Sequence, residues 1–122
     1  MKQEDKELLL KDLCGRLPYE TTIAYCQNEN DWFEEEVGVG IISICINDEY
    51  VVKPYLFPLS CMTEEQLNVI RDYNNSIEGR LVGMQGRAIY LIDWLNKNHF
   101  DYRGLIEKGL AIDATNLNIY RR

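Results

Sequence analysis

The sequence predicts an α+β fold: an N-terminal helix, a three-stranded antiparallel meander, then two to three C-terminal helices packed on it. Leucines recur at helical spacing near the N-terminus. Residues 19–59 are rich in β-branched and aromatic residues, and residues 63–66 carry a complete helix-start signal. The chain has 122 residues with no internal repeat or linker, so we expect a single domain over 1–122.

The first predicted helix covers residues 4–14. Leu9, Leu10 and Leu13 recur at helical spacing, and acidic residues gather in the first turn. Gly15 follows as a C-terminal stop, and a proline three residues later prevents continuation. A single apolar stripe indicates that this helix packs against a sheet.

Three strands are predicted between residues 19 and 53. Residues 19–26 alternate in polarity, which is typical of a half-buried strand, and a turn follows at 27–31. Residues 32–36 form either a second strand or an acidic loop. The run Val37–Ile46 is predicted as a central strand covered on both faces, and a turn at 47–49 leads to a short return strand at 50–53.

The segment Pro54–Leu59 is predicted as an extended crossover held to the core by its aromatic and leucine side chains. Two prolines remove ladder donors, which argues against an interior strand. An exposed proline-rich ligand for a partner is the alternative for this segment.

The C-terminal half is predicted to be helical. Thr63 and Gln66 form a capping box for a helix that runs to about Tyr73, with Met62 and Leu67 at the staple positions. A further helix is expected at 87–98, and a short one at 102–108 that Asp101 caps and Gly109 stops. Residues 75–86 give no definite prediction, and the segment after 110 is expected to be extended or frayed. The predicted buried stripe of the 87–98 helix consists of Ala88, Leu91, Ile92 and Leu95.

The net charge of −7 lies entirely in the first half of the chain. Residues 1–60 carry 12 acidic and 5 basic side chains, whereas residues 61–122 carry 8 of each. Nucleic-acid phosphates and anionic lipids require a basic face, so direct binding to either is not expected. No apolar run approaches the ~20 residues of a membrane span, and no secretory signal is present. We therefore expect a cytoplasmic protein.

No metal or cofactor motif is found in the sequence. The cysteines at 14, 26, 45 and 61 include no C-x-x-C pair, and the chain has one histidine. We expect reduced cysteines that serve as small apolar residues. The glycines form no phosphate-binding loop. Neither a metal site nor a cofactor is predicted.

Two segments carry candidate binding residues. Trp32 and Phe33 precede the acidic run Glu34, Glu35 and Glu36, and apolar anchors beside one sign of charge are typical of a protein-binding patch. A solvated acidic edge is the simpler interpretation of that run. His99 with Asp101 could form a general base and its orienting carboxylate, or the histidine could cap the preceding helix.

The chain resembles a group of small uncharacterised proteins of gut anaerobic bacteria and their phage-like mobile elements. The resemblance is carried by LLLKDLCGRLPY at 8–19, by VKPYLFPLSCMTEE at 52–65, and by IDWLN at 92–96 with HFDYRGLIEKGLA at 99–111. It implies a genetic setting and no catalytic residues. It also implies that residues 99–111 are a common docking element, either structural or functional. His99, Asp101 and Arg103 are the candidate binding residues within it.

The leading hypothesis is a non-enzymatic protein-interaction module or accessory protein of a mobile element, which binds another protein or itself. One alternative is an acidic nucleic-acid mimic that inhibits a DNA-binding protein, and it requires carboxylates in one stripe about 7 Å apart. The other alternative is a small enzyme that uses His99 and Asp101.

Overall fold

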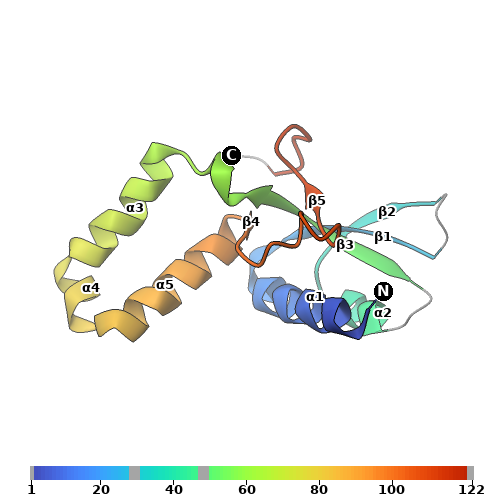
Figure 1. The fold of residues 1–122 in the computed structure, drawn as a ribbon, viewed down its shortest axis with the longest axis horizontal. Coiled ribbons are helices and arrows are strands. Elements are labelled where there is room, and N and C mark those ends of the chain that lie inside the picture. The colour runs from blue at the N-terminus through green and yellow to red at the C-terminus, as the bar shows by residue number, and fades with distance from the viewer. Residues whose placement is uncertain (1, 28–30, 47–49, 121–122) are drawn as a thin grey trace.

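The computed structural model describes residues 2–27, 31–46 and 50–120. They form an α+β fold with an N-terminal helix, a five-stranded sheet and further helices. Figure 1 shows two parts: a body that contains the sheet, and an arm of three helices that extends away from it. The predicted turns at 28–30 and 47–49 lie outside the described residues.

Helix α1, Gln3–Arg16, covers one face of the sheet and buries Leu9 and Leu13. The prediction that Gly15 ends this helix is wrong, because the helix continues through Arg16. The side chain of Arg16 pairs with Asp12 one turn earlier and stabilises the last turn. A 3₁₀ turn over Leu17–Tyr19 then brings the chain to the sheet.

The sheet is not a meander. Its strands are β1 (Thr22–Cys26), β2 (Phe33–Glu36), β3 (Val51–Pro58), β4 (Phe100–Asp101) and β5 (Ile112–Asp113). The order is β2-β1-β3-β4, and β5 also pairs with β3. β2 and β3 are antiparallel to β1, whereas β4 and β5 are parallel to β3. The first strand therefore lies between the next two, and the segment after 110, predicted to be extended or frayed, supplies the short strand β5.

The predicted central strand Val37–Ile46 is instead helix α2, Val39–Ile46. Val37 still donates its N–H to the carbonyl of Thr21 at 2.7 Å, so strand pairing ends there and the helix follows. Ile41 is buried while Val39 is 76% exposed, although both would share one face of a strand. A short apolar run fits a buried strand and a buried helix equally well, which explains the error.

The prediction that Pro54 and Pro58 exclude an interior strand is also wrong. Both lie in β3, which pairs with β1, β4 and β5. Successive residues of a strand direct their backbone groups to opposite edges. The N–H of Phe57 donates a 2.8 Å hydrogen bond to the carbonyl of His99, next to β4. Pro54 and Pro58 direct their backbone nitrogens to the opposite edge of β3 from Phe57. The N–H groups that these prolines lack are therefore not ones that would face β4.

The arm consists of α3 (Glu64–Asn75), α4 (Ile77–Leu81) and α5 (Gly83–Lys97). The capping box of Thr63 and Gln66 is confirmed. Residues 102–108 form turns and not the predicted helix. Asp101 accepts from backbone N–H groups there as a cap would, and Gly109 has the left-handed φ of 73° expected of a stop.

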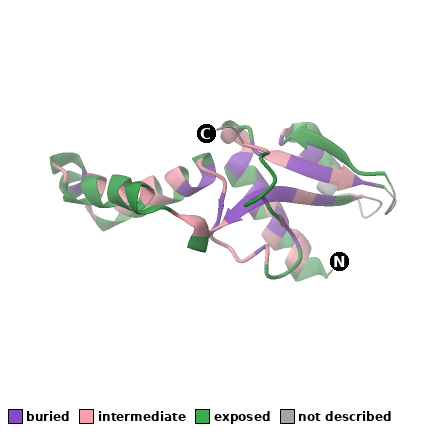
Figure 2. Cartoon of the chain, turned by 90° about the horizontal axis from the view of Figure 1, so that it is seen from above, coloured by how far each residue is buried: buried purple, intermediate pink, exposed green. Residues whose placement is uncertain are grey.

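Two apolar clusters form the core, one on each side of the sheet. The first joins α1 and α2 to β1 and β3 through Leu13, Ile41 and Leu56. The second contains Phe57, Leu95 and Phe100. Figure 2 shows that buried residues concentrate in the body and that the arm is largely exposed. The predicted buried stripe of α5 is therefore only partly right: Leu95 is buried and Leu91 half-buried, whereas Ala88 and Ile92 are exposed.

Candidate interaction surface

The arm is a helical hairpin that contributes little to the core. No residue of α3 is buried, and at the base of α5 only Leu95 and Asn96 are. The two long helices are held together by the rings of Tyr73 and Tyr90, which stack with centroids 3.6 Å apart. The hairpin therefore presents its surface to solvent along most of its length (Figure 1).

Hydrogen bonds fix the tip of the hairpin. The Ser76 hydroxyl donates to the carbonyl of Tyr73 at 2.6 Å and accepts from the N–H of Gly79 at 3.0 Å, so one side chain ends α3 and caps α4. The Arg87 guanidinium donates to the carbonyl of Gly79 at 2.9 Å and ties α4 to α5. These contacts define one conformation for the turn.

Two glycines permit the close packing at this tip. A Cβ atom on Gly79 would lie 2.0 Å from the carbonyl oxygen of Tyr73, and one on Gly86 would lie 2.3 Å from Cβ of Val82. Gly83 has a positive φ of 71° between α4 and α5. The sequence therefore specifies a compact tip.

This well-defined tip exposes large apolar side chains. Ile77, Leu81 and Met84 are each about four-fifths exposed, at 79%, 81% and 79%. Such exposure has no role in folding, because these side chains bury little surface within the chain. Clustered exposed apolar side chains indicate a contact surface.

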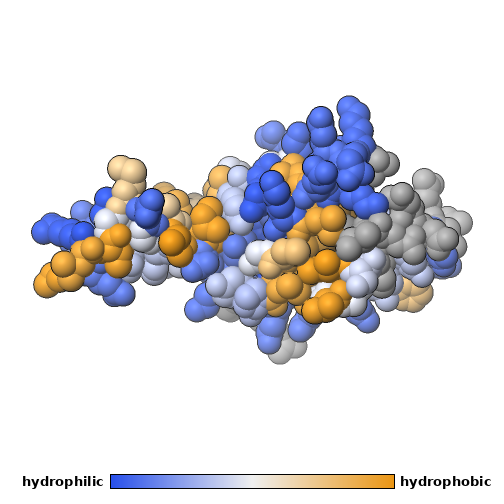
Figure 3. Space-filling model, turned by 90° about the horizontal axis from the view of Figure 1, so that it is seen from below, coloured by the Kyte–Doolittle hydropathy of each residue, from blue (hydrophilic) through white to orange (hydrophobic). Residues whose placement is uncertain are grey.

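The outer face of α5 continues the apolar surface toward the body. Ala88, Ile89 and Ile92 line a shallow hollow there together with Asp93. Ile89 is 63% exposed and Ile92 39%. Figure 3 views the molecule from the side on which α5 lies in Figure 1, and it shows hydrophobic side chains gathered on the arm. A helix that is apolar on its inner and outer faces is typical of the interior of a bundle.

Helix α3 differs, because its outer face is polar. Successive turns of α3 present charged and amide side chains on the side away from the half-buried Gln66, Ile70 and Tyr73. These outward residues are Glu64, Glu65, Asn68, Arg71, Asp72 and Asn75. Leu67 and Val69 of α3 are exposed as well, at 38% and 45%. We call the apolar surface of α5 and the tip the α5–tip face and define it as Ile77, Leu81, Met84, Ala88, Ile89 and Ile92.

The predicted aromatic and acidic segment lies elsewhere, on the edge strand β2. Trp32 and Phe33 are 44% and 57% exposed, and Glu34, Glu35 and Glu36 are all exposed. Glu34 accepts a 3.1 Å hydrogen bond from the Tyr55 hydroxyl. Burial, followed by this hydrogen bond, raises the pKa of Tyr55. Alternation along the strand places Glu35 on the opposite face from the other two glutamates.

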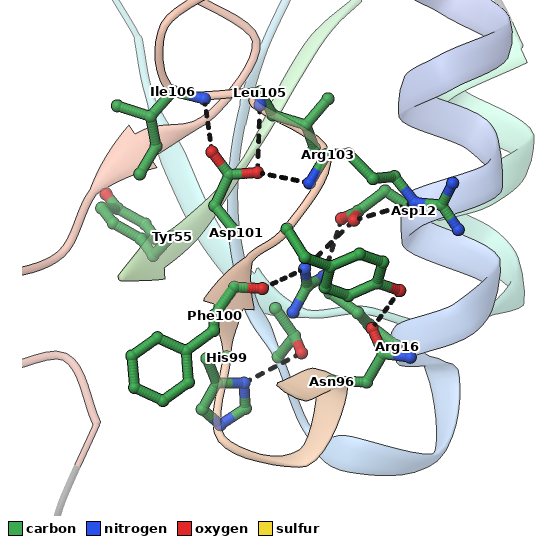
Figure 4. Close-up of polar contacts among 12 residues, drawn as sticks. Asp12, Arg16, Tyr55, Asn96, His99, Phe100, Asp101, Arg103, Leu105 and Ile106 are labelled. Atoms are coloured by element: carbon green, nitrogen blue, oxygen red, sulfur yellow. Dashed lines mark hydrogen bonds and ion pairs between the residues drawn. The ribbon is translucent and has the colours of Figure 1, made fainter. Parts of the chain in front are cut away.

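His99 and Asp101 each contact other residues of the body. Nδ1 of the His99 ring lies 3.1 Å from the hydroxyl oxygen of Thr21. The ring stacks on that of Tyr120, with centroids 3.7 Å apart. The Asp101 carboxylate instead accepts from the backbone N–H groups of Leu105 and Ile106 at 3.0 and 2.9 Å (Figure 4). The backbone N–H of His99 donates to the carbonyl of Asn96 at 3.2 Å and closes the end of α5.

Arg103 belongs to a buried charged network. Its Nε lies 3.5 Å from the Asp12 carboxylate, which also accepts from Arg16 Nε at 2.7 Å. Arg16 is fully buried and donates through Nη2 to the carbonyl of Phe100 at 2.6 Å. Arg103 and Arg16 also pack over the ring of Tyr102. This arrangement joins α1 to β4 and gives the Arg103 side chain a structural partner in Asp12.

A groove of about 450 Å³ lies beside His99, lined also by Tyr120, Glu36 and Lys97. The Tyr120 hydroxyl accepts from the N–H of Thr22 at 2.9 Å and donates to the carbonyl of Tyr55 at 2.7 Å. Burial raises the pKa of Tyr120 well above its usual range. These groups hold the C-terminal segment against the sheet.

Within 2–27, 31–46 and 50–120, no three His, Cys, Asp or Glu side chains gather closely enough to hold a metal ion. No helix in those ranges is both long and apolar enough to cross a bilayer. Cys14, Cys26 and Cys61 are free thiols.

Comparison of the chain with protein-family models, with curated proteins and with solved structures found no match. The assignment of the α5–tip face as a contact surface therefore depends on the geometry of the structure. Sequence reasoning missed Ile77, Leu81 and Met84, which lie in the segment 75–86 that gave no definite prediction. It also assigned Ala88 and Ile92 to the core, because periodicity marks an apolar face without showing what covers it.

Proposed function

We propose that this protein is a non-enzymatic interaction module that binds its partner through the α5–tip face. The observation that carries the proposal is the exposure of Ile77, Leu81 and Met84 on a tip that hydrogen bonds and two tightly packed glycines hold in place. Apolar side chains on a rigid support lose little entropy on binding, which favours their use as anchors.

Two further points support this function over catalysis. The carboxylate of Asp101 is occupied by backbone donors, and Arg103 pairs with Asp12, so neither is directed at a substrate. The resemblance at 8–19, 52–65 and 92–111 adds the setting of an accessory protein of a phage-like mobile element. The Trp32–Glu36 segment is a secondary contact of the module in this proposal.

Affinity capture from a native lysate at moderate salt tests the proposal. The wild-type bait is compared with a double variant, Ile77→Glu with Leu81→Glu, and with the matched control Val39→Glu, which changes an equally exposed apolar residue outside the arm. We expect a protein that the wild type and control retain and that the double variant loses by about tenfold or more. Equal recovery by all three baits would contradict the proposal.

A further inference from the structure

We infer that the groove beside His99 is a second binding site, and that its ligand is an organic cation with a guanidinium or alkylammonium group. The groove measures about 450 Å³, within the roughly 300–1,000 Å³ of most small-ligand pockets. It shares no lining residue with the α5–tip face, so the inference goes beyond the proposed function. The cation belongs either to a free amine or to a basic side chain of a bound peptide, which are two sources of the same chemistry.

Segments far apart in the sequence meet at this groove. The turn before β1, the strands β1 and β2, the junction between α5 and β4, and the C-terminal segment all contribute lining residues. Glu20 and His99, both among them, hold left-handed φ angles of 51° and 62°. Non-glycine residues in this conformation are uncommon and cluster at ligand sites. The groove also brings Glu36 close to His99, and these are candidate binding residues from two separate segments of the sequence.

Two carboxylates of the groove are open to a cation. Glu20 and Glu36 line it, and both residues are exposed. Glu36 pairs directly with Thr22 across β1 and β2, and Thr22 also lines the groove, so the Glu36 side chain stands on that side of the sheet. Neither carboxylate takes part in an ion pair with another residue of 2–27, 31–46 or 50–120. Their charge is therefore available to attract a cation from solution.

Lys97 lines the same groove without neutralising it. Its ammonium forms no ion pair with Glu20, with Glu36 or with any other residue that the structure describes. Carboxylates therefore outnumber ammonium groups by two to one among the described residues of the lining. Since like charges repel, Lys97 opposes the binding of a cation, and its removal should strengthen that binding.

Aromatic rings make the groove suitable for an organic cation. Tyr19 and Tyr120 both line it. The Tyr120 ring is fixed in place, because it stacks on His99 with centroids 3.7 Å apart and its hydroxyl bonds to the backbone of Thr22 and Tyr55. Aromatic rings attract organic cations, and a preformed wall loses little entropy on binding. A metal ion such as Ca²⁺ requires about six to eight oxygen ligands, whereas two carboxylates beside aromatic rings suit a guanidinium or alkylammonium group.

Titration of the isotope-labelled full chain, followed by heteronuclear NMR, tests the inference. The probes are agmatine, which is a free guanidinium amine, and a glycine–arginine–glycine tripeptide with blocked ends. We expect saturable shifts of the amide signals of Thr22, Asn98 and His99, with a dissociation constant of about 1 mM or below. Acetate, the anionic control probe, should cause no saturable shift. The tighter of the two cationic probes identifies the source of the cation.

Variants then test which charges carry the binding. The double variant Glu20→Gln with Glu36→Gln should weaken binding of the cationic probes by about tenfold or more. The matched control Glu35→Gln with Glu78→Gln removes the same charge outside the groove and should change binding by less than about twofold. Lys97→Gln should strengthen binding, because it removes a like charge. All five positions are exposed, and the same spectra show that each variant is folded.

Two results would overturn the inference. One is the absence of saturable shifts with both cationic probes, or an equal loss of binding in the double variant and its control. The other is tighter binding of acetate than of agmatine, since the groove would then select anions. Neither result bears on the proposed function, because Ile77→Glu with Leu81→Glu should abolish protein capture and leave cation binding unchanged.

Discussion

Arg16 donates a 2.6 Å hydrogen bond from Nη2 to the carbonyl of Phe100, which lies 84 residues further along the chain. The guanidinium is fully buried and shares the Asp12 carboxylate with Arg103. This contact ties the N-terminal helix to the strand that follows the arm. The base of the arm is thereby attached to the body, which is what a projecting contact surface requires.

Replacing Asp12 should strongly destabilise the fold. Asp12→Ala leaves Arg16 buried without its counter-charge, and we expect a loss of about 3–5 kcal/mol in the free energy of unfolding. Urea denaturation followed by circular dichroism measures it. The exposed neighbour Lys11→Ala should change stability by less than about 0.5 kcal/mol. A loss below about 1 kcal/mol for Asp12→Ala would show that the network is not buried as described.

A pair of substitutions tests whether residues 39–46 are helical. Ile41→Asp should unfold the protein or cost about 3 kcal/mol or more, because Ile41 is 4% exposed in the core. Val39→Asp should be tolerated, since Val39 is 76% exposed. Thermal denaturation of both variants gives the answer. A strand would place both side chains on one face, so comparable losses at the two positions would contradict α2.

The tip of the arm should be a local folding unit. Gly79→Ala forces a methyl group against the carbonyl of Tyr73, and we expect the turn of α4 to open. Hydrogen exchange should rise in residues 64–94 while β1 and β3 stay protected, because α3 buries no core residue. Thr63→Ala, which removes the capping box, should give a milder effect of about 1 kcal/mol confined to the start of α3. Uniform exchange over the whole chain would refute a separate arm.

Stability should fall at alkaline pH. Burial raises the pKa of Tyr120 above the ordinary value of 10.0, and that of Tyr55 is raised too. As the pH rises, the two tyrosines therefore lose their protons at a lower pH in the unfolded state than in the folded state. Their contribution to the free energy of unfolding is complete below about pH 10 and is lost as the pH rises further. Denaturant titrations between pH 7 and 12 measure the slope.

Tyr120→Phe separates the contribution of Tyr120 to the alkaline loss of stability from that of Tyr55. The variant loses the hydrogen bonds to Thr22 and Tyr55, and we expect it to be less stable by about 1–2 kcal/mol at pH 7. Its alkaline slope should be shallower than that of the wild type, because only Tyr55 remains of the two. A variant slope as steep as the wild-type slope would mean that Tyr120 does not titrate in this way.

The candidate surface could be predicted only in part. The exposed acidic run at Glu34–Glu36 agrees with the prediction of a solvated edge, because the charged side chains of an edge strand remain in contact with water. The apolar tip could not be predicted, since Ile77, Leu81 and Met84 have the composition of core residues. Which apolar residues are covered depends on the position of the rest of the chain.

The sequence by itself determined the local features, whose physical causes span a few residues. The capping box at Thr63, the first helix and the β1 strand all depend on hydrogen bonds or periodicity within one turn or one strand. Only the tertiary structure decided that residues 39–46 form a helix, that a strand with two prolines lies inside the sheet, and that one face of α5 stays uncovered. These outcomes depend on which distant segments pair and pack, and the free energy of such contacts cannot be read from neighbouring residues.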